Sequence, residues 1–241
     1  MIYIQSNDER TLAHHFDCSC ALYGAIENGL DYRLTTFDEV RSGKFDQLIR
    51  KKLFVGSVEF MREVFKRVGL NDVRVPKNSN RTHRVETLGE IKRSSQLGNK
   101  HFIKPIDIKL FTGFVIDQMQ YTSIQSLPDD TPVMVYDVFK GDLLSEWRVY
   151  INNHKMVDSR NYSGDFTICP NYDYIQTVID ENKKDFPISY TMDIGILSTE
   201  ENVVVEFNDM WAIGNYGIDN ELYLKLLRNR YFEIMTIFIE V

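Results

Sequence analysis

Residues 190–196 read Tyr-Thr-Met-Asp-Ile-Gly-Ile, and residues 203–209 read Val-Val-Val-Glu-Phe-Asn-Asp. Each segment is typical of an apolar strand interrupted by one acid, Asp193 or Glu206. Asn208 lies two residues beyond Glu206, so both side chains point to the same strand face. If the two strands pair, two carboxylates and an amide oxygen converge, which suits Mg²⁺. We therefore predict a magnesium site at Asp193, Glu206 and Asn208, and the alternative of a solvated face fits poorly with acids inside apolar runs.

The preceding segment, residues 144–165, is expected to form a hairpin that turns at Asn152-Asn-His154. Glu146, Arg148 and Tyr150 share one face of its first strand, and Arg160 ends the returning strand. An arginine on an inner strand face needs an anionic partner, because burying an unpaired charge is costly. A phosphate or carboxylate substrate would serve. An internal ion pair between Glu146 and Arg148 is the open alternative.

Further upstream, Lys104 ends an apolar strand and is followed by Lys109 and Thr112-Gly113. Two lysines, a hydroxyl and backbone N–H groups can neutralise a polyphosphate. The segment is not a Walker A loop, because no Gly-Lys-Ser/Thr opens a helix. A strand with solvated lysines is the alternative.

Residues 132–141 combine an apolar strand, Pro-Val-Met-Val-Tyr136, with a polar turn. The backbone at the end of such a strand can bind the edge of an adenine. A simple buried strand is the alternative interpretation.

The first 75 residues alternate between expected strands, at 1–5, 32–36 and 52–56, and helices. The first helix is expected over 9–29, with Leu12, Phe16, Leu22 and Ile26 on its apolar face and a glycine at its end. The second is expected over 58–68. A polar stretch at 76–82 then predicts a boundary between a domain of residues 1–78 and one of residues 79–241. The second domain is predicted to be a mostly antiparallel sheet with helices at 172–184 and 219–234.

The formal net charge of −7 argues against strong nucleic-acid binding. Three cysteines are too few and too irregular for a disulfide framework. The N-terminal residues lack the pattern of a signal peptide, and no apolar run reaches the ~20 residues of a membrane span. We therefore expect a cytoplasmic protein.

Taken in this order, the segments resemble the ATP-grasp fold. The closest resemblance is to a phage-enriched clade named for one arginine and two lysines, and RimK-like and glutathione-synthetase-like ligases are similar more distantly. Lys104, Lys109 and Arg148 resemble the trio, and Val55-Gly-Ser-Val-Glu-Phe60 resembles the segment that precedes the ATP-grasp domain in that clade. The resemblance implies an α+β fold in which two subdomains clasp ATP, after a small α/β pre-ATP-grasp domain. For a phage-encoded chain, the compartment would be the host cytoplasm.

The resemblance also implies roles for individual residues. Lys104 would contact the α- and β-phosphates, and Lys109, Thr112 and Gly113 would belong to a loop over the phosphates. The backbones of Tyr136 and Val138 would bind adenine beside a nucleotide site that includes Glu146. Arg148 and Arg160, with Lys109, would be catalytic, and Asp193, Glu206 and Asn208 would hold Mg²⁺. The segment Lys109-Leu-Phe-Thr-Gly113 is shorter and bulkier than the glycine- and serine-rich loop of many ATP-grasp ligases.

The implied activity is an ATP-dependent ligation of a carboxylate to an amine, or a thiol, through an acyl phosphate. The substrates would be small molecules or peptides, for example an amino acid joined to a peptide, a protein or a modified nucleotide. Two alternatives stay open: a phage protein that binds ATP without catalysis or inhibits a partner, and a phosphotransferase on the same scaffold. The sequence does not specify the oligomeric state.

Overall fold

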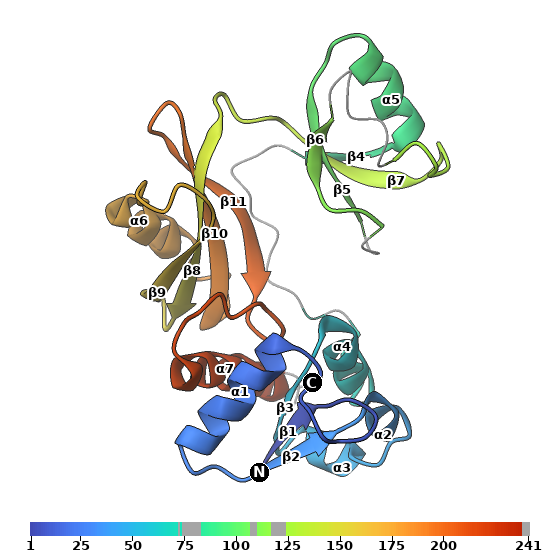
Figure 1. Ribbon diagram of the computed structural model, residues 1–241, viewed down its shortest axis with the longest axis vertical. Coiled ribbons are helices and arrows are strands. Elements are labelled where there is room, and N and C mark those ends of the chain that lie inside the picture. Colours follow the sequence, from blue (N-terminus) through green and yellow to red (C-terminus); the bar gives the residue numbers. More distant parts are fainter. Residues whose placement is uncertain (72, 74–82, 107–109, 117–123, 238–241) are drawn as a thin grey trace. The chain divides into compact units, whose positions relative to one another are not determined.

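The computed structural model describes residues 1–71, 73, 83–106, 110–116 and 124–237 of the chain (Figure 1). The chain forms two compact units. Unit 1 comprises Met1–Asn78, Leu144–Ile196 and Glu200–Val241, and unit 2 comprises Ser79–Leu143 and Leu197–Thr199. The division at residues 78 and 79 stays a prediction about domain organisation.

The N-terminal part of unit 1 is a parallel three-stranded sheet, as the alternating pattern predicts. β1 (Ile2–Gln5) lies between β2 (Tyr32–Thr35) and β3 (Leu53–Val55), and both pairs are parallel. The strands are connected by α1 (Phe16–Glu27), α2 (Phe37–Arg41) and α3 (Asp46–Ile49), and β3 leads into α4 (Val58–Lys66). Ser57 caps α4 by accepting a hydrogen bond from the Phe60 N–H group.

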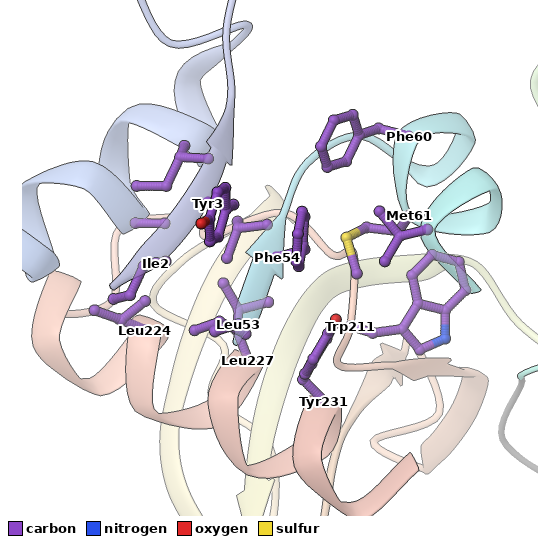
Figure 2. Packing of buried hydrophobic residues seen from close by; sticks show 14 of the residues in the cluster. Ile2, Tyr3, Leu53, Phe54, Phe60, Met61, Trp211, Leu224, Leu227 and Tyr231 are labelled. Atoms are coloured by element: carbon purple, nitrogen blue, oxygen red, sulfur yellow. The ribbon is translucent and has the colours of Figure 1, made fainter. Parts of the chain in front are cut away.

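The core of unit 1 joins the beginning of the chain to α7 (Asn220–Ile237). Figure 2 shows Leu224, Leu227 and Tyr231 of α7 beneath the strand residues Ile2 and Leu53. The Tyr231 hydroxyl donates a hydrogen bond to the Ile49 carbonyl at 2.7 Å. Trp211 belongs to the same core, where its ring meets Phe65 edge to face with centroids 5.3 Å apart. Segments from both ends of the described chain therefore share one core.

The expected apolar face of the first helix is wrong at three of its four residues, because only Leu22 packs against the core. α1 begins at Phe16 rather than at residue 9, and Leu12, Phe16 and Ile26 are among the exposed large hydrophobic residues. The buried face is made of small side chains: Cys18, Cys20, Ala21, Gly24 and Ala25. They allow the backbone of α1 to approach α7 closely, and a Cβ atom at Gly24 would lie 2.4 Å from the Asn220 carbonyl oxygen.

Replacing Gly24 by alanine is expected to lower the free energy of unfolding by about 1–3 kcal/mol, because the new methyl group meets backbone that cannot easily move. Helix propensity alone predicts the opposite sign, a gain of about 0.5–1 kcal/mol. Tyr23→Ala on the exposed side of the same helix is the matched control and should change little. Urea denaturation measures both variants. A stability of Gly24→Ala equal to or above wild type would contradict this packing.

The rest of unit 1 is a four-stranded sheet in the order β11-β10-β8-β9. Its strands are β8 (Leu143–Asn152), β9 (Lys155–Gly164), β10 (Ser189–Leu197) and β11 (Asn202–Asp209). One face packs on α6 (Tyr172–Asn182) through Val149, Met192, Ile194 and Val204, among others. Because side chains alternate along a strand, the residues that come between these apolar ones, among them Arg148 and Asp193, point to the other face.

Unit 2 contains an antiparallel sheet in the order β4-β7-β5-β6. Its strands are β4 (His83–Thr87), β5 (His101–Pro105), β6 (Phe114–Ile116) and β7 (Pro132–Tyr136), and its helix is α5 (Leu88–Gln96). Ile103, Val133 and Val135 form a core with Leu88 and Ile91 of the helix. None of the described helices combines the length and the apolar character that crossing a membrane requires.

Candidate functional site

The two segments that carry the acids pair as neighbouring antiparallel strands. Asp193 of β10 lies opposite Glu206 of β11, and Thr191 lies opposite Asn208. The register shifts directly after Asp193. All four side chains belong to the face of the sheet opposite α6, since the intervening Met192 packs into the α6 core.

Asp193 forms a buried, two-pronged ion pair with Arg148 of β8. The Nε and Nη2 atoms of Arg148 donate to the two carboxylate oxygens, each at 2.8 Å. The side chains are only 6% and 3% exposed. This planar geometry is the strongest arrangement available to an arginine and a carboxylate. The partner of Arg148 in the protein is therefore Asp193 rather than Glu206 or the neighbouring Glu146.

Asn208 connects the two acids. Its Nδ2 atom lies 3.1 Å from Glu206 Oε1 and 3.5 Å from Asp193 Oδ2. A half turn of the amide exchanges its nitrogen and oxygen, so the same position can present Oδ1 to a cation. Within the described part of the chain, no three or more His, Cys, Asp or Glu side chains gather as a metal site. Two carboxylates and an amide nevertheless fit Mg²⁺, which commonly takes its remaining ligands from water and phosphates.

Burial dominates the electrostatics of this cluster. It raises the pKa of Asp193 to about 6, against the hydrogen bonds from Arg148, and the charges of Glu206 and Glu146 act in the same direction as burial. Burial would lower the pKa of Arg148, but the hydrogen bonds to Asp193 raise it above its ordinary value. The negative charges of Glu206 and Glu146 thus disfavour ionisation of Asp193. A divalent cation bound between the carboxylates would offset this repulsion.

The remaining predicted residues of unit 1 lie on β8 and β9. Arg160 is directly opposite Arg148, and its Nη2 atom donates to Asp158 at 2.9 Å. The Nε atom of Arg160 is buried and has no hydrogen-bond partner among the described residues. Glu146 accepts a hydrogen bond from the Tyr162 hydroxyl at 3.0 Å. The face of the sheet opposite α6 therefore carries both predicted arginines as well as the predicted metal ligands.

Lys104 and Tyr136 lie together in unit 2. They occupy the paired strands β5 and β7, and Lys104 Nζ lies 5.2 Å from the centre of the Tyr136 ring. Val138 follows the end of β7. A Cβ atom at Gly113 would lie 3.2 Å from Lys104 Cβ, so the backbone before β6 passes close to this lysine. Thr112 precedes that glycine, and Lys109 lies outside the described residues.

Residues 79–226 match the model of an ATP-grasp domain family, the second family of the clade that is named for one arginine and two lysines. This region is more than half of the chain. The chain belongs to the ATP-grasp family. No curated protein has a significantly similar sequence.

Solved ATP-grasp structures share the fold at low sequence identity. The ATP-grasp ligase PsnB, complexed with minimal precursor, Mg and ADP, is 11% identical with a TM-score of 0.52, and the match covers 95% of this chain and 96% of PsnB. The D-alanine–D-alanine ligase of Bacillus anthracis, complexed with ATP, is 10% identical with a TM-score of 0.52 over 98% of this chain and 97% of that one. A RimK domain ATP-grasp protein of Sphaerobacter thermophilus DSM 20745 is 8% identical with a TM-score of 0.52 over 98% and 99%. The predicted α+β ATP-grasp fold is confirmed.

Sequence reasoning missed three side chains beside the acidic cluster of this ATP-grasp protein. Tyr162 and Tyr216 stack with ring centroids 5.2 Å apart, next to the Arg148 guanidinium. The Thr191 hydroxyl is fully buried, shares the face of Asp193, and has no hydrogen-bond partner in the part of the chain that the structure describes. Period-two spacing from Asp193 and Arg160 would have found Thr191 and Tyr162. Nothing in the sequence pattern marks Tyr216, which follows β11 in an irregular loop.

Proposed function

We propose that this protein is an ATP-dependent ligase that phosphorylates a carboxylate and joins the resulting acyl phosphate to an amine, or to a thiol. The observation that carries the proposal is the polar face of unit 1. There, Asp193, Glu206 and Asn208 gather beside the Arg148 guanidinium in a chain of the ATP-grasp family. Peptides or small molecules are the proposed substrates.

The predicted residues have distinct roles in the proposed nucleotide binding. Lys104 of unit 2 would bind phosphate oxygens, while the backbones of Tyr136 and Val138 would bind adenine. The loop that contains Lys109, Thr112 and Gly113 would cover the phosphates. Mg²⁺ held by the two acids and the amide would supply positive charge to the terminal phosphates. Fold relatives crystallised with Mg and ADP, or with ATP, support this choice of cofactors.

The proposed reaction has two steps. A carboxylate oxygen of the substrate attacks the γ-phosphorus, and the bond to the β,γ-bridging oxygen breaks to release ADP. An amine, or a thiolate, then attacks the carbonyl carbon of the acyl phosphate, and inorganic phosphate leaves. Arg148 and Arg160 would stabilise the negative charge that develops on the transferred group, and the ion pair with Asp193 already holds the Arg148 guanidinium in place.

The proposal predicts Mg²⁺-dependent release of ADP that requires a carboxylate substrate. Purified protein would be incubated with ATP, Mg²⁺ and pooled amino acids, with hydroxylamine as a small nucleophile that converts acyl phosphates into hydroxamates. We expect ADP and a hydroxamate to form together. Calorimetric binding of Mg-ATP without ADP release from any pool would favour the non-catalytic alternative. A product that gains the mass of a phosphoryl group, instead of a condensed product, would identify a phosphotransferase.

A further inference from the structure

The loop of residues 210–219, which follows β11, holds one side chain in a strained conformation. Tyr216 has φ of +47°, in the left-handed region that favours glycine. Such a conformation costs a tyrosine free energy and persists only where the surroundings impose it. Tyr216 as a whole residue is 47% exposed, so burial of its ring in the core does not explain the strain.

The residue before Tyr216 supplies the restraint. Asn215 is buried, and its N–H group donates to Asp17 Oδ1 at 2.8 Å. Its carbonyl accepts from the Tyr150 hydroxyl at 2.6 Å, and its side chain accepts from the Gly217 N–H group at 2.7 Å. These bonds connect the loop to α1 and to β8. The strained backbone is therefore fixed from several sides, which is typical of functional positions.

The restraint places the Tyr216 ring against the arginine of the candidate site. The guanidinium carbon of Arg148 lies 4.5 Å from the Tyr216 ring centre and 5.8 Å from that of Tyr162. The two rings are nearly parallel, at 15°. The Tyr162 hydroxyl is tied to Glu146, and burial raises the pKa of Tyr162 well above its ordinary value, so it stays a donor. The stacked pair thus restricts the guanidinium on one side, and Asp193 restricts it along one edge.

Among the described residues, one nitrogen of Arg148 has no acceptor and can bind a ligand. Asp193 occupies Nε and Nη2, whereas no described residue accepts a hydrogen bond from Nη1. Gly214 borders this atom, and a Cβ atom there would lie 3.5 Å from Nη1. The Asp193 carboxylate bound by Arg148 also lies within 3.5 Å of Asn208. An anionic oxygen beside a cation at Asp193 and Asn208 would therefore lie near Nη1.

We propose that Tyr216 is a positioning residue that holds the Arg148 guanidinium so that Nη1 binds the terminal phosphate of Mg-ATP. This inference rests on the proposed function of the site. Tyr216 acts through its ring and the stack with Tyr162, not through its hydroxyl.

The test compares Tyr216→Gly with Tyr216→Phe. Calorimetry gives the dissociation constants of Mg-ADP and of the Mg complex of adenylyl imidodiphosphate, which retains a terminal phosphate and is not hydrolysed. Wild type should prefer the analogue, because only the analogue reaches Nη1. In Tyr216→Gly, the ratio of the Mg-ADP dissociation constant to that of the analogue should fall about tenfold, because the charge-assisted hydrogen bond from Arg148 Nη1 is poorly placed. The affinity for Mg-ADP should be unchanged. Tyr216→Phe should keep the preference.

Stability separates this role from a purely structural one. Glycine adopts the left-handed conformation without strain, so the melting temperature of Tyr216→Gly should fall by no more than about 4 °C. An analogue preference that is equal in wild type and Tyr216→Gly, or absent from wild type, would overturn the positioning role. A loss of the preference that Tyr216→Phe also shows would overturn it too. The same holds for a loss in Tyr216→Gly that is accompanied by a large drop in melting temperature. If the preference behaves as expected while wild type releases no ADP with any pool, the ligase proposal fails and the positioning role stands.

Discussion

Replacing Glu206 by glutamine is expected to reduce ATP turnover by about 100- to 1,000-fold, as the loss of one preorganised electrostatic group at a reacting centre does. Glutamine has the shape of glutamate, and it can still bond to Asn208, which lies 3.1 Å from Glu206 Oε1. The substitution therefore removes a charge with little change in packing. The concentration of Mg²⁺ needed for half-maximal ADP release should rise at the same time, because one of the two proposed carboxylate ligands is lost.

Glu201→Gln is the matched control for this variant. Glu201 is exposed in the turn that leads into β11, so the same change of charge occurs one residue before the strand but away from the cluster. Its turnover and Mg²⁺ requirement should equal those of wild type. Full turnover by Glu206→Gln, at an unchanged Mg²⁺ requirement, would remove Glu206 from the proposed metal site.

Replacing Lys104 by methionine is expected to weaken Mg-ATP binding by about 10- to 100-fold, the factor that corresponds to a hydrogen bond to a charged group of about 1.5–3 kcal/mol. Methionine keeps a long apolar side chain over the Tyr136 ring, where Lys104 Nζ lies 5.2 Å from the ring centre, so the local packing is largely preserved. Calorimetric titration with Mg-ATP measures the effect. Binding of adenosine, which has no phosphates, should be unchanged.

Lys100→Met provides the control for nonspecific charge effects. Lys100 is exposed directly before β5, so its removal changes the net charge of unit 2 without altering the strand that carries Lys104. Equal loss of affinity in both variants would mean that the overall charge of unit 2, rather than a contact from Lys104, attracts the nucleotide.

Strand periodicity predicted the arrangement of the acids well. The rule that residues two apart share a face placed Glu206 beside Asn208, and the apolar runs around Asp193 and Glu206 marked the two strands that pair. Strand periodicity could not predict that Asp193 is the ion-pair partner of Arg148. That partner depends on which strand lies beside β8, and the sequence offered a nearer acid, Glu146, on the same strand.

Side-chain size misled the prediction for α1. Hydrophobic periodicity favoured the large residues Leu12, Phe16 and Ile26 as the buried face, but the helix packs through small residues because it meets another helix at close range. β4 was missed because its sequence, His-Arg-Val-Glu-Thr, is largely polar and shows no apolar strand pattern. It forms a strand through its pairing with β7.

The shared core of unit 1 has a consequence for how the protein is made. The ribosome delivers β1, α1 and β3 first, yet the helix that covers Ile2 and Leu53 emerges only after all of unit 2 has been synthesised. Unit 2, which is almost continuous in sequence, can complete its own core in the meantime. The apolar surface of the early strands therefore stays uncovered until α7 has been made, and we expect nascent unit 1 to be prone to aggregation during that time.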